Sequence, residues 1–181
     1  GPLFERGLAP AKRAQIGAHY TSRDDILLIV EPVVMEPLRR EWEEVRAKAD
    51  RLAEAFWAAK DPSTRTRRRR ELERVLLDFQ ERLASVTILD PACGSGNFLY
   101  VALALLKDLE KEVITYATHR GLTMMLPRVT PRQLWGIETN AYAHELAQIV
   151  VWIGYIQWMT ANGFQVNRDP VLEPMDTILL M

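Results

Sequence analysis

A glycine-containing turn between a short apolar stretch and a long one constrains the fold of this chain more than any other feature. Residues 86–89 are apolar and rich in β-branched side chains, residues 90–96 are Asp-Pro-Ala-Cys-Gly-Ser-Gly, and residues 97–117 are largely apolar. This order predicts a strand, a tight turn and a buried helix. A strand that passes through a glycine turn into a helix is typical of α/β folds with a parallel sheet.

Two further strands are expected along the chain. Residues 133–137 and 177–181 have the composition of strands, and residues 141–160 between them predict a helix so apolar that most of its circumference must be covered. The order strand, helix, strand, helix, strand predicts a parallel, doubly wound sheet with right-handed crossovers.

The N-terminal part predicts an irregular arm followed by one short helix. Residues 3–18 are mixed in character, and Ser22 has the position of an N-cap for a helix over residues 23–30. Pro32 and Pro37 are expected to break or kink that helix, because each lacks a backbone amide donor.

A charged helical hairpin follows. Residues 38–60 and a second segment up to residue 83 each carry apolar side chains at spacings of three and four, separated by a turn at 61–64. The two apolar stripes predict an antiparallel pair of helices. The domain division is therefore 1–37 for the arm and first helix, 38–85 for the hairpin, and 86–181 for the α/β part.

Composition excludes several classes of protein. The net charge is −1, with 23 Lys and Arg against 24 Asp and Glu, so any contact with nucleic acid must be local. One cysteine and three scattered histidines predict no disulfide and no metal site. The longest apolar run, 98–106, is shorter than the ~18 residues of a membrane span, and no signal-like segment begins the sequence. We expect a cytosolic protein that does not enter a membrane.

The candidate site lies where two predicted strands end. Gly94 and Gly96 leave room for a ligand to approach the backbone, and Glu138 could accept hydrogen bonds from two ribose hydroxyls. A dinucleotide is disfavoured, because Leu99 stands where its fingerprint needs a glycine and Asp90 would repel a pyrophosphate. Asp90 instead suits the ammonium of S-adenosylmethionine, whose carboxylate the turn amides would bind.

At these residues the sequence resembles a known family. Residues 90–99 are similar to the S-adenosylmethionine motif of bacterial amino-methyltransferases that act on adenine in DNA. Residues 17–21, Gly-Ala-His-Tyr-Thr, resemble the motif that precedes the glycine motif in the gamma-ordered group, and residues 136–143 resemble its second motif. The sequences of residues 29–34 and 152–158 most resemble those of the MmeI-like (type IIL) restriction-modification proteins.

The resemblance implies a fold, a cofactor and a function. The fold would be a partial, Rossmann-like class I methyltransferase fold with three parallel strands, an N-terminal arm and a helical hairpin. The full-length protein would bind double-stranded DNA and methylate the exocyclic amino group of adenine, in restriction-modification or phage defence, in the bacterial cytoplasm. The implied cofactor-binding residues are Tyr20, Thr21, Asp90, Ala92, Cys93, Gly94, Gly96, Asn97, Phe98, Glu138, Thr139 and Asn140.

The catalytic motif of the family, Asn or Asp followed by Pro-Pro and an aromatic residue, is not in the sequence, which has no Pro-Pro pair. The resemblance implies that this motif lies beyond Met181, so the chain has no catalytic residue of its own and is expected to be inactive alone. Alternatives are methylation of cytosine N4 in DNA, methylation of protein glutamine, and a degenerate cofactor domain that acts as a scaffold.

Several of these residues also have plain structural interpretations. Cys93 suits packing in a tight turn better than nucleophilic catalysis, since no histidine accompanies it. Tyr20 could stack near the sulfonium or anchor the arm, Phe98 could face ligand or core, and Asn140 could cap the following helix. Arg67, Arg68, Arg69 and Arg70 could contact DNA phosphates, or form a solvated face with the acids that follow them.

Overall fold

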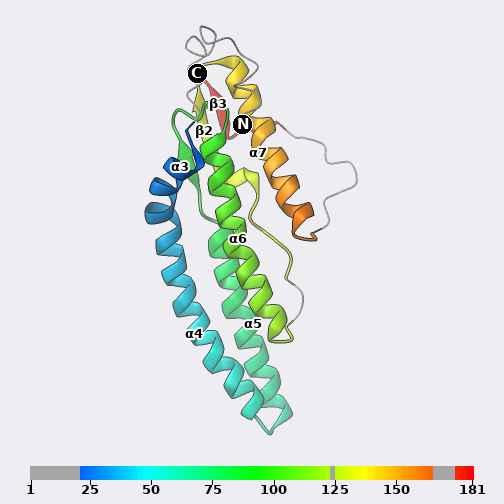
Figure 1. Ribbon diagram of the computed structural model, residues 1–181. Helices are drawn as coiled ribbons and strands as arrows, with labels where there is room; N and C mark the ends of the chain where they lie inside the picture. The colour runs from blue at the N-terminus through cyan, green and yellow to red at the C-terminus, as the bar shows by residue number, and fades with distance from the viewer. Residues whose placement is uncertain (1–20, 123–124, 165–173) are drawn as a thin grey trace. The chain divides into compact units, whose positions relative to one another are not determined.

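The computed structural model describes residues 21–122, 125–164 and 174–181 (Figure 1). These residues divide by their packing into two units. The sheet unit comprises Gly1–Val30 as far as it is described, Thr87–Leu105 and Thr130–Met181. The helical unit comprises Glu31–Val86 and Leu106–Val129. The predicted division after residues 37 and 85 follows the sequence motifs and stays a prediction.

Three short strands form the sheet. They are β1 (Ile88–Asp90), β2 (Leu134–Glu138) and β3 (Ile178–Leu180), paired in parallel in the order β1-β2-β3. The parallel sheet is as predicted, although its first strand begins two residues later than residue 86. The order runs without a reversal, so the reversal that defines a doubly wound sheet does not occur among these three strands.

The two faces of the sheet differ in burial. Ile88, Leu134 and Ile178 are buried on one face. Their neighbours on the other face remain exposed, by 59% for Leu89, 42% for Trp135 and 44% for Leu179. Side chains alternate along each strand, and parallel sheets in α/β proteins are usually covered on both faces. The described residues thus cover one face of this sheet.

Two long helices follow the first two strands, α6 (Asn97–His119) and α7 (Ala141–Ala161). Both were predicted, with ends within two residues of those observed. Gly154 of α7 packs directly on the Tyr100 ring, since a Cβ at Gly154 would lie 2.2 Å from the ring. The sequence predicts that most of the circumference of α7 is buried. The described residues bury it incompletely, because Ile149 and Ile153 are exposed.

The helix after the arm forms as predicted. In α3 (Arg23–Val30), Ser22 Oγ accepts a hydrogen bond from the Asp25 amide at 3.1 Å. Pro32 and Pro37 are expected to break or kink this helix, and α3 does end at Val30, but the chain stays helical through a π-helix, η1 (Glu31–Met35), into the next helix. A π turn is a local departure from the α-helical hydrogen-bond pattern, and Pro37 stands in the first turn of the next helix, a position that tolerates proline.

The helical unit contains the predicted antiparallel hairpin. α4 (Glu36–Ala58) and α5 (Pro62–Ala84) lie side by side (Figure 1), with the Trp42 and Phe79 rings stacked 5.4 Å apart. The predicted turn at 61–64 is shorter than expected, because Asp61 caps α5 by accepting the Thr64 amide at 2.8 Å. Among the described residues, no helix meets the length and hydropathy that crossing a membrane requires.

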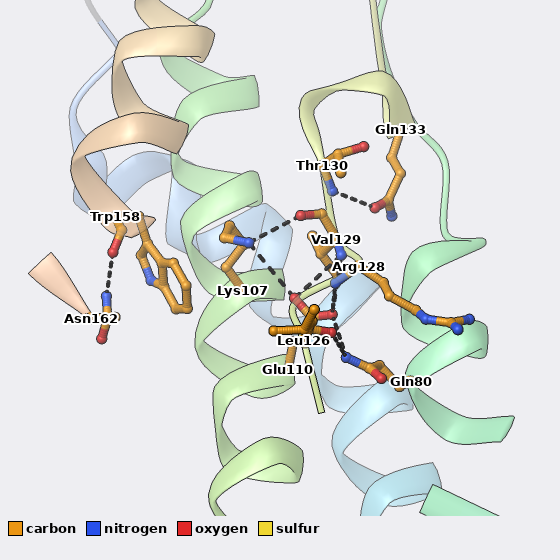
Figure 2. A network of polar contacts seen from close by, with 10 residues as sticks. All are labelled: Gln80, Lys107, Glu110, Leu126, Arg128, Val129, Thr130, Gln133, Trp158 and Asn162. Atoms are coloured by element: carbon orange, nitrogen blue, oxygen red, sulfur yellow. Dashed lines mark hydrogen bonds and ion pairs between the residues drawn. The ribbon is translucent and has the colours of Figure 1, made fainter. Parts of the chain in front are cut away.

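A buried polar network joins α5, α6 and the loop after α6 (Figure 2). Glu110 is fully buried and accepts hydrogen bonds from Gln80 Nε2 and the Val129 amide, both at 3.1 Å. Lys107, also fully buried, donates to the Val129 carbonyl at 3.0 Å and lies 3.7 Å from the Glu110 carboxylate. These contacts attach the loop to both helices.

Candidate cofactor site

The glycine turn starts at the end of β1 and is attached to β2. Asp90 Oδ1 accepts the Ala92 amide at 3.0 Å, and the Cys93 amide donates to the Ile137 carbonyl at 3.0 Å. Gly94 and Gly96 have φ angles of 51° and 79°. Both angles lie in the left-handed region that favours glycine, so the local path of the chain depends on these two residues.

The two glycines have different surroundings. A Cβ at Gly94 would meet nothing within 4 Å, so the backbone there is open to a ligand. A Cβ at Gly96 would lie 3.0 Å from the Cα and carbonyl oxygen of Ala147, so Gly96 allows the turn to pack against α7. The sequence analysis did not identify Ala147 as a residue that packs against the turn. The pattern that could have identified it is a row of small or β-branched residues at helical spacing, Ala143, Ala147, Val151 and Gly154.

Glu138 connects the two strand ends. Its Oε2 accepts the Gly94 amide at 2.8 Å, and its Oε1 accepts the Thr139 and Asn140 amides, each at 2.8 Å. The carboxylate therefore holds the glycine turn and the loop after β2 together. The structure thus brings Asp90 and Gly94, which belong to one motif, together with Glu138, which belongs to another.

The electrostatics of this site favour a cation. Burial raises the pKa of Asp90, and the negative charge of Glu138 raises it further, against the hydrogen bond from the Ala92 amide. The two carboxylates are close enough to affect one another, and no basic side chain among the described residues pairs with them. A positively charged ligand group would therefore stabilise their charged forms. No group of three metal-binding side chains occurs among the described residues.

Cys93 has the environment of a packing residue. Its Sγ fills the space beside Gly136, where a Cβ would lie 2.8 Å from the sulfur. Burial and the nearby charges of Asp90 and Glu138 raise the pKa of the thiol to about 11. The thiol is therefore protonated at neutral pH, which disfavours its alternative interpretation as a nucleophile.

Other predicted site residues lie in the same unit. Asn140 caps α7, since its Oδ1 accepts the Tyr142 and Ala143 amides at 3.0 and 3.1 Å. Phe98 is half-buried in the first turn of α6. The Thr21 carbonyl accepts a hydrogen bond from Asn97 Nδ2 at 2.7 Å, and Tyr20 lies outside the described residues.

The arginine run belongs to α5 in the helical unit and is largely paired. Arg68 lies 2.7 Å and Arg67 3.9 Å from Glu71, and Arg69 lies 3.0 Å from Glu73. Arg70 is exposed and has no ion pair within the described part of the chain. This pattern fits a solvated helix face with one arginine left for another partner.

A groove of about 640 Å³ lies elsewhere in the sheet unit, along α7 and β3. His144, Gln148, Trp152 and Leu180 are among its lining residues, and none of the predicted cofactor residues is. His144 Nε2 lies 2.9 Å from the Ile178 carbonyl at one wall of this groove. The groove is therefore distinct from the glycine turn.

These features define an α/β domain whose parallel strands end in an acid-flanked glycine turn and a carboxylate. The chain belongs to the family of the MmeI DNA-methyltransferase domain, whose model matches residues 64–176. It is 29% identical over 154 residues to DNA methyltransferase A of Bacillus subtilis strain 168, an alignment that covers 84% of this chain and 15% of that protein.

A solved structure gives the same result. The chain resembles the type IIL restriction-modification enzyme MmeI, solved in complex with DNA, with a TM-score of 0.69 and 26% sequence identity. That match covers 96% of this chain and 21% of the MmeI chain. The chain thus spans less than a quarter of the length of either relative, and the expected family resemblance is confirmed.

Proposed function

We propose that this chain is the S-adenosylmethionine-binding part of a DNA methyltransferase with a Rossmann-like class I fold. The observation that carries the proposal is the 2.8 Å hydrogen bond between Glu138 Oε2 and the Gly94 amide, which brings a ribose-type carboxylate to an acid-flanked glycine turn. Membership of the MmeI methyltransferase family supports it, because a methyltransferase needs a methyl donor.

The residues of the turn fit this cofactor. Gly94 leaves its backbone open, and Asp90 Oδ2 has no hydrogen bond to the described residues, so it can accept one from an ammonium group. Glu138 Oε2 accepts one amide and keeps room for a ribose hydroxyl. Asp90 would hold the ammonium, the turn amides the carboxylate, and Glu138 the ribose. The cofactor supplies an electrophilic methyl group on its sulfonium.

For the full-length enzyme we propose methylation of the exocyclic amino group of adenine in double-stranded DNA, in restriction-modification or phage defence in the bacterial cytoplasm. A base in a duplex is reached by flipping it out, and hydrogen-bond acceptors that draw protons from its amino group make the nitrogen a better nucleophile. We expect those acceptors to come from the Asn/Asp-Pro-Pro-aromatic motif of the family, which residues 1–181 do not contain, so the part of the reaction that we assign to this chain is cofactor binding.

Calorimetric titration of the chain with S-adenosylmethionine and S-adenosylhomocysteine tests the site. We expect saturable binding that Glu138→Ala weakens by about ten-fold or more, the loss of a charge-assisted hydrogen bond. Glu54→Ala is the matched control, since Glu54 is an exposed glutamate of α4 in the helical unit. Binding that survives Glu138→Ala would contradict the proposed site.

A longer form of the protein tests the reaction. After incubation with DNA and labelled cofactor, nucleoside analysis should find the methyl group on adenine N6. Label found on cytosine N4 or on protein glutamine would contradict adenine as the target and identify one of these alternatives instead. Absence of both binding and transfer in the longer, folded form would favour the scaffold alternative.

A further inference from the structure

We infer that Asn97 is a positioning residue that couples the segment entering α3 to the glycine turn, an inference that rests on the proposed function. Asn97 is the first residue of α6, directly after the turn. Its side-chain amide donates to the Thr21 carbonyl at 2.7 Å, across 76 positions of sequence. Asn97 thereby holds Thr21 at the edge of the proposed cofactor site.

The requirements of the helix do not explain this asparagine. Asparagine is a poor residue inside a helix and usually bonds to backbone groups close to it in sequence. The first turn of α6 is instead closed by the backbone, with the Tyr100 amide donating to the Gly96 carbonyl at 2.9 Å. The side chain of Asn97 is therefore used for the long-range contact.

The segment that Asn97 holds is itself ordered by its own cap. The Ser22 hydroxyl accepts the Asp25 amide, and the Ser22 carbonyl accepts the Ile26 amide, each at 3.1 Å. Ile26 and Val30 of the same helix are fully buried. Thr21 therefore accepts a hydrogen bond from Asn97 and directly precedes the capped start of α3. A shift of the glycine turn would move Asn97 and so displace the start of α3.

The chain offers a matched control for this hydrogen bond. Asn162, at the end of α7 in the same unit, donates from its side-chain amide to the Trp158 carbonyl at 2.7 Å (Figure 2). Asn97→Ala and Asn162→Ala each remove an amide-to-carbonyl bond of equal length. Asn97→Asp is a second variant that cannot donate to Thr21, while an acid at the start of α6 favours the helix dipole.

Each variant is titrated with S-adenosylmethionine and examined by hydrogen exchange of the backbone amides of residues 22–26. Both Asn97 variants should raise the Kd about five-fold and speed exchange at 22–26 by a similar factor. Asn162→Ala should change neither the Kd nor the exchange rates at 22–26 by more than about two-fold. Such a factor corresponds to the smallest contribution expected of one hydrogen bond.

The outcomes separate the two proposals. A raised Kd with unchanged exchange at 22–26 would mean that Asn97 acts on the cofactor without Thr21, which overturns the inference. Unchanged Kd in both Asn97 variants overturns it as well. If the wild-type chain does not bind the cofactor, the proposed function fails, and unchanged exchange at 22–26 in the Asn97 variants would then overturn the coupling separately.

Discussion

Two carboxylates, one in each unit, accept backbone amides in similar ways and have opposite surroundings. Glu110 in the helical unit is fully buried, with Lys107 at 3.7 Å and Gln80 at 3.1 Å (Figure 2). Glu138 in the sheet unit is partly exposed, accepts three amides at 2.8 Å, and has another acid, Asp90, as its charged neighbour.

The difference shows how surroundings separate a structural carboxylate from a binding one. Burial lowers the pKa of Lys107, and the charge of Glu110 opposes that shift in part, so each of the two groups has its counter-charge within the protein. At Glu138 the nearby charge is repulsive, and a cationic ligand would improve the balance. We expect the first carboxylate to matter for folding and the second for binding.

The largest expected effect is that of Glu110→Ala on stability. The substitution leaves Lys107 buried without its counter-charge and the Val129 amide without its acceptor, so it should cost about 3–5 kcal/mol of unfolding free energy. Glu138→Ala should cost about 1 kcal/mol, because water can reach the amides it releases. Urea unfolding of both variants measures the two costs.

The comparison also predicts how the double variant behaves. Lys107→Met combined with Glu110→Gln removes both buried charges, and it should be more stable than Glu110→Ala because no charge is left unpaired. Similar costs for Glu110→Ala and Glu138→Ala would show that burial does not separate these two carboxylates, and the comparison would fail.

The second effect divides the glycine turn itself into a structural part and a binding part. Gly96→Ala combines a left-handed φ with a collision against the α7 backbone and should cost about 2–4 kcal/mol. Gly94→Ala has the φ penalty with open space around it and should cost about 1 kcal/mol.

The measurement is again urea unfolding, combined with titration of the cofactor. Gly94→Ala should weaken binding more than its small cost in stability suggests, since its Cβ would occupy space left for the ligand. If both alanine variants lose the same free energy of unfolding, the close approach of Gly96 to Ala147 does not contribute to the cost of the Gly96 substitution.

The sheet unit could be predicted from sequence because its signals are local. The strand, the glycine turn and the apolar helix are consecutive, and Glu138 directly follows the predicted second strand, residues 133–137. What could not be predicted depends on residues far apart in sequence. Lys107 and Glu110 interrupt an apolar helix, and only the fold shows that Gln80 and the backbone of residues 128–129 satisfy them.

The hairpin and the proline segment teach a similar lesson. The stripes of apolar residues predicted two antiparallel helices, because a 3.6-residue period is visible in one sequence. The π-helix at Glu31–Met35 was not predicted, since the residue before a proline is biased away from helix and no local signal marks a π turn. The hydrogen bond from Asn97 to Thr21 was equally out of reach, since it crosses 76 positions.

The smallest expected effect is a gain in stability from Asp90→Asn. Burial and the charge of Glu138 raise the pKa of Asp90 in the folded chain, so folding favours the protonated carboxyl. The folded chain then binds this proton more tightly than the unfolded chain, and stability is lost as pH rises through the raised pKa. Asparagine keeps the acceptor for the Ala92 amide and carries no charge, so it avoids that loss.

We therefore expect Asp90→Asn to match the wild type near pH 3.8 and below, and to exceed it by about 0.5 kcal/mol at pH 7. Urea unfolding across this range measures the difference, and in a Glu138→Gln background the gain should shrink because one source of repulsion is gone. The same variant should bind S-adenosylmethionine more weakly, since it lacks the charge that faces the ammonium. A variant that is less stable at pH 7, or that binds cofactor as tightly as the wild type, would place Asp90 with Glu110 as a structural carboxylate.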